Sequence, residues 1–148
     1  MRYALLLLLF AAAPHLIAAD VEIPFELDEG HSLILVTTQV NGRDALTIVD
    51  TGAPLTMFSP AAAGVDSFAM ARSRFMKDSP GFLAVGVNKQ VRLTFGGTTR
   101  DRVVGAVDMS KVRETYRRPI DGLIGQDVLR ELKRVVIDYE RRVLILTR

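Results

Sequence analysis

The spacing of apolar residues predicts strands in the N-terminal part of the chain. Between residues 20 and 30 apolar and polar side chains alternate, which is typical of an extended segment with one buried face. Residues 33–40 form a longer apolar strand. The Asn41-Gly42 pair after it is a strong signal for a tight hairpin turn into a second strand over 45–49. The chain is therefore expected to begin as antiparallel β-structure.

The same pattern continues to the C-terminus. Gly96-Gly97 and the charged run Glu140-Arg141-Arg142 are turn signals that separate neighbouring apolar segments. The strands that these segments predict span residues 84–87, 91–95, 102–107, 135–139 and 143–146.

Helical signals are few and short. Ser59-Pro60 and Gly64 follow the order of a helix cap, a first-turn proline and a terminating glycine. Residues 126–134 place apolar side chains on one helical face, whereas the charged, proline-terminated stretch 111–119 is typical of a solvated loop. The whole pattern predicts one all-β domain with one or two short helices.

The first 19 residues differ from the rest. Arg2 precedes an apolar stretch over 4–13, and small residues follow at 16–19, as in a signal peptide with its cleavage site. The stretch is shorter than the roughly 20 residues of a membrane-spanning helix, and an uncleaved anchor is the alternative. We expect residues 1–19 to be a signal peptide and residues 20–148 to be one domain. That domain would be secreted, most simply into a bacterial periplasm, with no stable membrane span.

Charge and composition narrow the function classes. The chain has 19 basic and 17 acidic residues, and loss of Arg2 with the signal peptide brings the two closer to balance. A balanced chain gives no reason to expect nucleic acid as a partner. There is no cysteine, so the fold uses no disulfide. His31 is the one histidine after the signal peptide, so we expect no metal site and no cofactor.

The strongest chemical signal is Asp50-Thr51-Gly52-Ala53 at the end of the apolar run 45–49. A carboxylate placed where a buried strand breaks is costly unless polar groups surround it. The Thr51 hydroxyl can fix such a turn, and Gly52 lets backbone amides approach the carboxylate. Alone, the triplet is also compatible with a plain Asx turn.

Three segments together resemble the retropepsin-like aspartic peptidases, the group of retroviral proteases and their single-domain bacterial relatives. In that family a strand runs into Asp-Thr-Gly, two apolar residues and a glycine later precede a short helix, and a hairpin ends the domain. The matching segments here are residues 47–56, residues 121–129, and Val136-Ile137-Asp138-Tyr139 with residues 143–146.

The resemblance implies a closed acid-protease barrel that acts as a homodimer, because the chain carries one Asp-Thr-Gly only. Asp50 of each subunit would meet on the two-fold axis. Thr51 would brace the partner subunit, and the Gly52 backbone would bind substrate together with Ala53 of the same loop. The run Leu123-Ile124-Gly125 would pack beneath that loop and hold its shape.

The implied activity is hydrolysis of peptide bonds in extended polypeptides. Two carboxyls held close share one proton, so one can activate water while the other polarises the amide. Asp121 could in principle supply the second carboxyl within one chain, but its context favours a structural turn. Asp127 and Asp138 likewise suggest a helix N-cap and a hairpin turn.

Two positions depart from the retroviral pattern. Retroviral enzymes have a carboxylate after Asp-Thr-Gly-Ala that grips the substrate backbone, and it pairs with an arginine after the second glycine. Pro54 and Gln126 stand there in this chain. The loss of both charges keeps open a second hypothesis, in which a non-catalytic domain of this fold binds an extended peptide or a partner protein.

The flap that covers substrate in the family has a weaker counterpart. The best candidate spans residues 79–86, where Gly81 and Gly86 permit bends and Phe82 or Leu83 could cover a substrate. An ordinary core hairpin is the alternative for this segment.

Overall fold

The computed structural model describes residues 20–28, 30, 32–65 and 86–148. The predicted signal peptide, His31 and three of the candidate flap residues, Gly81, Phe82 and Leu83, lie outside these ranges. Gly86 is the first residue of a strand. Among the residues described, no helix has the length and apolar character needed to cross a membrane.

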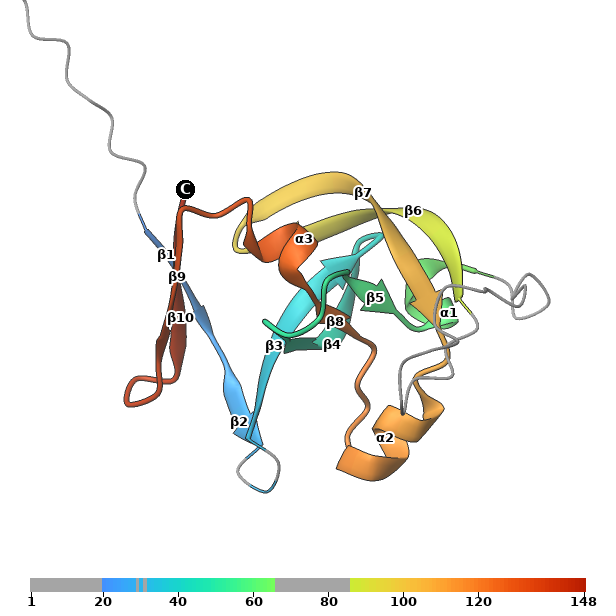
Figure 1. The fold of residues 1–148 in the computed structure, drawn as a ribbon, viewed down its shortest axis with the longest axis horizontal. Coiled ribbons are helices and arrows are strands. Elements are labelled where there is room, and N and C mark those ends of the chain that lie inside the picture. The colour runs from blue at the N-terminus through green and yellow to red at the C-terminus, as the bar shows by residue number, and fades with distance from the viewer. Residues whose placement is uncertain (1–19, 29, 31, 66–85) are drawn as a thin grey trace, which may run out of the picture.

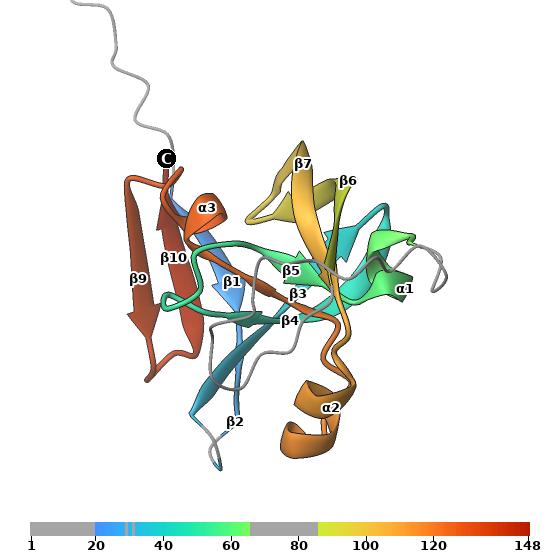
Figure 2. The same cartoon turned by 45° about the vertical axis from the view of Figure 1, so that its right-hand side comes forward.

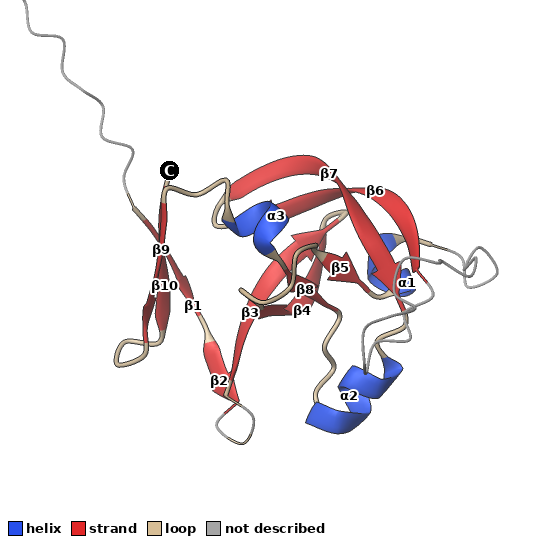
Figure 3. Ribbon diagram, viewed as in Figure 1, coloured by secondary structure: helices blue, strands red, loops and turns tan. Residues whose placement is uncertain are grey.

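A closed barrel forms the body of the molecule (Figures 1 and 3). Its sheet has the order β2-β3-β4-β8-β5-β7-β6, and a further pairing of β3 with β6 closes the ring. The all-β, retropepsin-like barrel that the sequence predicted is confirmed. The strands of this sheet are β2 (Glu26–Asp28), β3 (Leu33–Val40), β4 (Arg43–Val49), β5 (Met57–Phe58), β6 (Gly86–Phe95), β7 (Thr98–Val107) and β8 (Gly122–Ile124).

The predicted turns lie where the sequence indicated. Asn41 and Gly42 both have positive φ angles, 53° and 78°, as the tight turn between β3 and β4 requires. Gly96 and Gly97, at 58° and 70°, make the equivalent turn between β6 and β7. The strand predicted over 91–95 is part of a longer strand, β6, which begins at Gly86 and runs through the exposed polar residues 88–90.

The two ends of the described chain form a second, smaller sheet at one side of the barrel (Figure 1). Its order is β1 (Val21–Pro24), β10 (Val143–Thr147), β9 (Arg134–Asp138), and every pairing is antiparallel. Leu144 and Leu146 on β10 are fully buried in the same hydrophobic core as Phe58 and Ile124 of the barrel. The small sheet is thus packed firmly against the barrel.

Three short helices complete the described structure, α1 (Pro60–Ala63), α2 (Ser110–Tyr116) and α3 (Gln126–Leu129). Helix α1 has the predicted cap at Ser59 and the left-handed glycine at Gly64. The predicted helix over 126–134 is shorter than expected: α3 ends at Leu129, turns follow over 130–133, and β9 begins at Arg134.

Helix α2 corrects the prediction of a solvated loop over 111–119. Asp108 accepts hydrogen bonds from the backbone N and the Oγ of Ser110 at the start of the helix. Arg113 then donates to the Ile120 carbonyl at 2.8 Å and to Asp121 Oδ1 at 2.9 Å. These contacts, together with the packing of Val112 against Val107 and Met109, stabilise a short charged helix.

Candidate active site

Asp50 leaves the barrel directly after β4. Strand β4 runs parallel to β8, with Val49 opposite Ile124. The Asp50 backbone N donates to the Ile124 carbonyl at 3.0 Å, which extends the pairing by one residue. The sequence therefore places this carboxylate beside the second motif, because both motifs end neighbouring strands that share one direction.

The Asp-Thr-Gly turn closes on its own carboxylate. Gly52 N donates to Asp50 Oδ1 at 2.8 Å, and Ala53 N donates to the Asp50 carbonyl at 3.3 Å. The approach of the Gly52 amide is the one that the sequence predicted. Thr51 and Gly52 are exposed, whereas Ala53 is buried. The loop thus turns toward solvent, and one oxygen of the Asp50 carboxylate is held by the Gly52 amide.

The run Leu123-Ile124-Gly125 lies beneath this loop. Leu123 and Ile124 are buried, and an added Cβ on Gly125 would come within 2.6 Å of the Leu55 backbone. Such an approach is open only to glycine. The structure therefore brings the two sequence motifs together, and their catalytic roles stay predictions.

Gln126, which directly follows the second motif, makes two hydrogen bonds to the Asp50 loop. Its Nε2 donates to the Thr51 carbonyl at 2.8 Å, and its backbone N donates to the Ala53 carbonyl at the same distance. A neutral side chain thus binds the loop at the position where the retroviral pattern has arginine.

Thr56 and Asp127 form a connection that sequence reasoning missed. Asp127 Oδ1 accepts from the Thr56 N at 2.9 Å and from its Oγ1 at 2.7 Å. Thr56 Oγ1 in turn accepts from Gly125 N at 3.0 Å. The N-cap of α3 is Gly125, so the prediction of Asp127 as the N-cap was wrong. The sequence feature that could have indicated this connection is Thr56, the threonine that ends the first motif.

Asp121 has a structural role in this chain. Its Oδ2 accepts from Leu46 N at 3.3 Å, its Oδ1 accepts from Arg113, and its backbone N donates to the Leu46 carbonyl at 2.7 Å. It does not line the hollow that Asp50 lines. Asp138 Oδ1 accepts from Arg141 N at 2.9 Å, which is the predicted hairpin turn.

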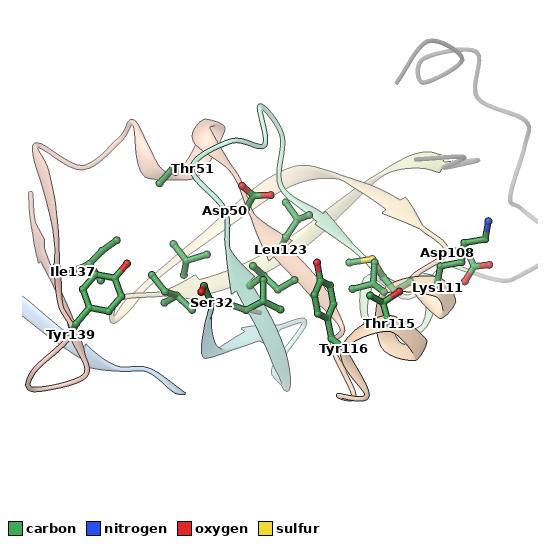
Figure 4. A pocket seen from close by; sticks show the side chains of 16 residues that line it. Ser32, Asp50, Thr51, Asp108, Lys111, Thr115, Tyr116, Leu123, Ile137 and Tyr139 are labelled. Carbon is green, nitrogen blue, oxygen red and sulfur yellow. The ribbon is translucent and has the colours of Figure 1, made fainter. Parts of the chain in front are cut away.

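Asp50 lines a hollow of about 580 Å³ (Figure 4). This volume is within the range of ligand pockets in proteins. The barrel supplies most of its apolar wall, and α2 and β9 lie toward its two ends. The lining residues are Ser32, Leu33, Ile34, Ile48, Val49, Asp50, Thr51, Asp108, Met109, Lys111, Val112, Thr115, Tyr116, Leu123, Ile137 and Tyr139.

Helix α2 is the part of this hollow that the sequence analysis did not anticipate. Lys111, Val112 and Thr115 line it from the helix, and Figure 4 shows Asp108 and Lys111 at the end far from Thr51. The hydrogen bonds from Ser110 lower the pKa of the Asp108 carboxyl below its usual value. Among the described residues, no group of three His, Cys, Asp or Glu side chains could hold a metal ion.

Comparison with known proteins identifies the fold. A retropepsin-like aspartic protease from Rickettsia conorii matches 86% of this chain and 89% of its own, at a TM-score of 0.56 and 20% sequence identity. The retroviral protease-like domain of Ddi1 from Leishmania major matches 78% and 91%, at a TM-score of 0.46 and 12% identity. No protein-family model and no curated protein matches the chain. The chain has the retropepsin-like fold, as its two motifs implied.

Proposed function

We propose that this protein is an aspartic endopeptidase that acts as a homodimer. One observation carries the proposal: the Asp50 carboxylate stands on a tightly bonded loop at the mouth of an apolar hollow. An acidic residue that is held by hydrogen bonds in this way, within a fold similar to that of an aspartic protease, suits a catalytic role better than a purely structural role in a turn.

The chemistry requires a second carboxyl close to the first. One Asp50, ionised, takes a proton from a water molecule, and the other, protonated, donates to the oxygen of the peptide carbonyl. The water oxygen bonds to the carbonyl carbon, and the C–N bond breaks once the amide nitrogen has gained a proton. The pair titrates as a unit, so each apparent pKa belongs to both carboxyls.

The rest of the site would hold the substrate. Gly52 and Ala53 offer backbone groups to an extended chain, and the apolar wall formed by Ile34, Ile48 and Leu123 would receive apolar side chains. We therefore expect cleavage between or near apolar residues. Thr51 lies at the exposed tip of the loop, in a position to contact the second subunit.

A non-catalytic, peptide-binding domain is the second candidate. Besides Asp50, the carboxylate that lines the hollow in the described residues is Asp108, which lies at the far end in contact with Ser110 (Figure 4). One copy of the chain thus offers a groove with a single reactive carboxyl. Such a copy could bind an extended peptide without cutting it.

The proposal includes export of the protein. The segment 1–19 has the composition of a signal peptide. The chain has no cysteine, so its fold requires no disulfide and it has no cysteine for attachment of a lipid. We propose a periplasmic or secreted location, which N-terminal sequencing of the protein recovered from each cell fraction would test.

A peptide library tests the activity. Wild-type protein, Asp50→Asn and the matched control Asp44→Asn, whose carboxylate lies on the exposed β3–β4 hairpin, are compared between about pH 3 and about pH 7. Cleavage by wild type and Asp44→Asn alone supports the peptidase. No cleavage by any of the three, in folded dimeric protein, favours the binding domain. Equal cleavage by all three rejects the role of Asp50.

A further inference from the structure

The wall of the hollow beside Asp50 is mostly apolar, whereas a peptide that binds there brings backbone N–H and C=O groups with it. Ile34, Ile48 and Leu123 form part of this wall. A backbone group that is removed from water and finds no hydrogen-bond partner costs free energy. Pro54, which follows Ala53 in the Asp50 loop, has no backbone N–H to offer. The peptide therefore needs polar partners from another part of the chain.

Helix α2 supplies polar side chains to the hollow. Figures 1 and 2 show this helix projecting from the barrel on the side away from the small sheet. Lys111, Thr115 and Tyr116 line the hollow from the helix. Lys111 lies beside Asp108 at the far end, and Tyr116 lies between that end and Asp50 (Figure 4). A peptide that extends from Asp50 toward α2 therefore passes Tyr116 first.

The side chain of Tyr116 is directed into the hollow. Figure 4 shows its ring pointing from α2 toward Leu123, with the hydroxyl at the tip. Leu123 faces Ile48 in the pairing of β8 with β4, two residues before Asp50. Tyr116 is half-buried, so its ring continues the apolar wall while its hydroxyl adds a hydrogen-bonding group to that wall.

Hydrogen bonds fix α2 to the strand that carries Asp50. Arg113 on the helix donates to the Ile120 carbonyl at 2.8 Å and to Asp121 Oδ1 at 2.9 Å. Asp121 Oδ2 accepts from Leu46 N, and Asp121 N donates to the Leu46 carbonyl. Leu46 belongs to β4, which ends immediately before Asp50. The position of Tyr116 relative to the Asp50 carboxylate is therefore set by the fold.

We propose that Tyr116 binds the backbone of the peptide that occupies the hollow. Its hydroxyl donates a hydrogen bond to a peptide carbonyl on the α2 side of the bond that faces Asp50. The inference rests on the proposed function in one respect: the hollow must receive an extended peptide. It adds a substrate-binding residue that contacts the backbone, so this contact is the same for peptides of different sequence.

Peptide binding without cleavage tests the role of the hydroxyl. In Asp50→Asn protein the peptide stays intact, and the fluorescently labelled library peptide that this protein binds most tightly serves as the probe. Adding Tyr116→Phe keeps the ring and removes the hydroxyl, which should raise the Kd roughly fivefold. The control is Glu114→Gln in the same background, because Glu114 is exposed on the same helix and does not line the hollow. Equal Kd values in all three proteins would overturn the inference.

Thioamide peptides test whether the hydroxyl acts on a carbonyl of the peptide. Each backbone C=O of the probe is replaced in turn by C=S, which is a weaker hydrogen-bond acceptor. At one position the replacement should weaken binding to the protein that has Tyr116 and leave binding to the Tyr116→Phe protein unchanged. If Tyr116→Phe instead weakens the binding of every peptide by the same factor, its effect is structural and the inference is wrong.

The two proposals fail in different ways. Binding that depends on the Tyr116 hydroxyl, in a protein that cuts no peptide, leaves this inference standing and rejects the peptidase. Cleavage that requires Asp50, with the same KM in wild type and Tyr116→Phe, leaves the peptidase standing and rejects the role of Tyr116.

Discussion

Thr56 and Asp127 are joined by two hydrogen bonds, from the backbone N and from the hydroxyl of Thr56 to one carboxylate oxygen, at 2.9 Å and 2.7 Å. The two residues stand 71 positions apart in the sequence. Thr56 ends the loop that begins with Asp50, and Asp127 lies in the first turn of α3. The connection therefore fixes the far end of the active-site loop to the helix that follows the second motif.

Loss of the Thr56 hydroxyl should destabilise the whole domain. Thr56 is fully buried, and its Oγ1 also accepts from Gly125 N. In Thr56→Val the shape is kept, but a buried N–H and a carboxylate each lose a partner, which costs about 1–3 kcal/mol of unfolding free energy. Urea unfolding measures this loss. Thr56→Ser keeps the hydroxyl and should cost less, and equal losses in both variants would contradict the role of the hydroxyl.

Gly125→Ala should be far more harmful than Gly105→Ala. A Cβ on Gly125 would meet the Leu55 carbonyl carbon and oxygen at 2.6 Å and the Ala53 carbonyl oxygen at 2.9 Å, all backbone atoms that cannot move away. A Cβ on Gly105 would meet the flexible Met57 side chain at 3.2 Å. We expect a loss of more than about 2 kcal/mol for the first and less than about 1 kcal/mol for the second in urea unfolding. Similar losses would mean that the loop can shift.

Gln126→Glu should make peptide cleavage depend on pH in a new way. An ionised glutamate cannot donate to the Thr51 carbonyl, which Gln126 Nε2 now does at 2.8 Å, whereas a protonated one can. We expect kcat to fall roughly tenfold near neutral pH and to approach the wild-type value below about pH 4. Gln126→Leu, which never donates, should show the loss at every pH. A constant ratio of Gln126→Glu to wild type would reject the positioning role.

Ser110 should contribute to stability only when Asp108 is ionised. The side-chain hydrogen bond from Ser110 lowers the pKa of Asp108 in the folded protein. A lowered folded pKa gives stability that is present above the unfolded pKa, near 3.9, and is lost as the pH falls through the folded value. Because Asp108 is exposed, Ser110→Ala should cost less than about 1 kcal/mol at neutral pH and less still below about pH 4. Urea unfolding at both pH values measures the difference, and a loss that grows in acid would contradict this account.

Local signals predicted most of the barrel. Asn41-Gly42 and Gly96-Gly97 fixed the hairpins because tight turns demand positive φ angles. The helix α2 was missed because its stability comes from Arg113, which reaches Ile120 and Asp121, and from the Asp108 contact with Ser110. Nothing in the spacing of charged residues over 111–119 reveals such contacts.

Some residues of the candidate site could likewise be predicted from the sequence, and others could not. Asp50, Thr51 and Gly52 could be found from the sequence, because a carboxylate at a strand end followed by glycine is chemically unusual. The hydrogen bond from Gln126 to the Thr51 carbonyl and the Thr56–Asp127 pair could not. Both join residues that only the parallel pairing of β4 with β8 brings together.

The central claim is that each active site uses two Asp50 carboxylates, one from each copy. Wild-type protein and Asp50→Asn are mixed in equal amounts, allowed to exchange subunits, and assayed on a cleaved peptide. Random pairing leaves about a quarter of the dimers with two intact carboxylates, so activity should fall to about a quarter of that of the same total amount of wild type. A fall to about one half would mean that a single Asp50 suffices in each chain, and it would contradict the account.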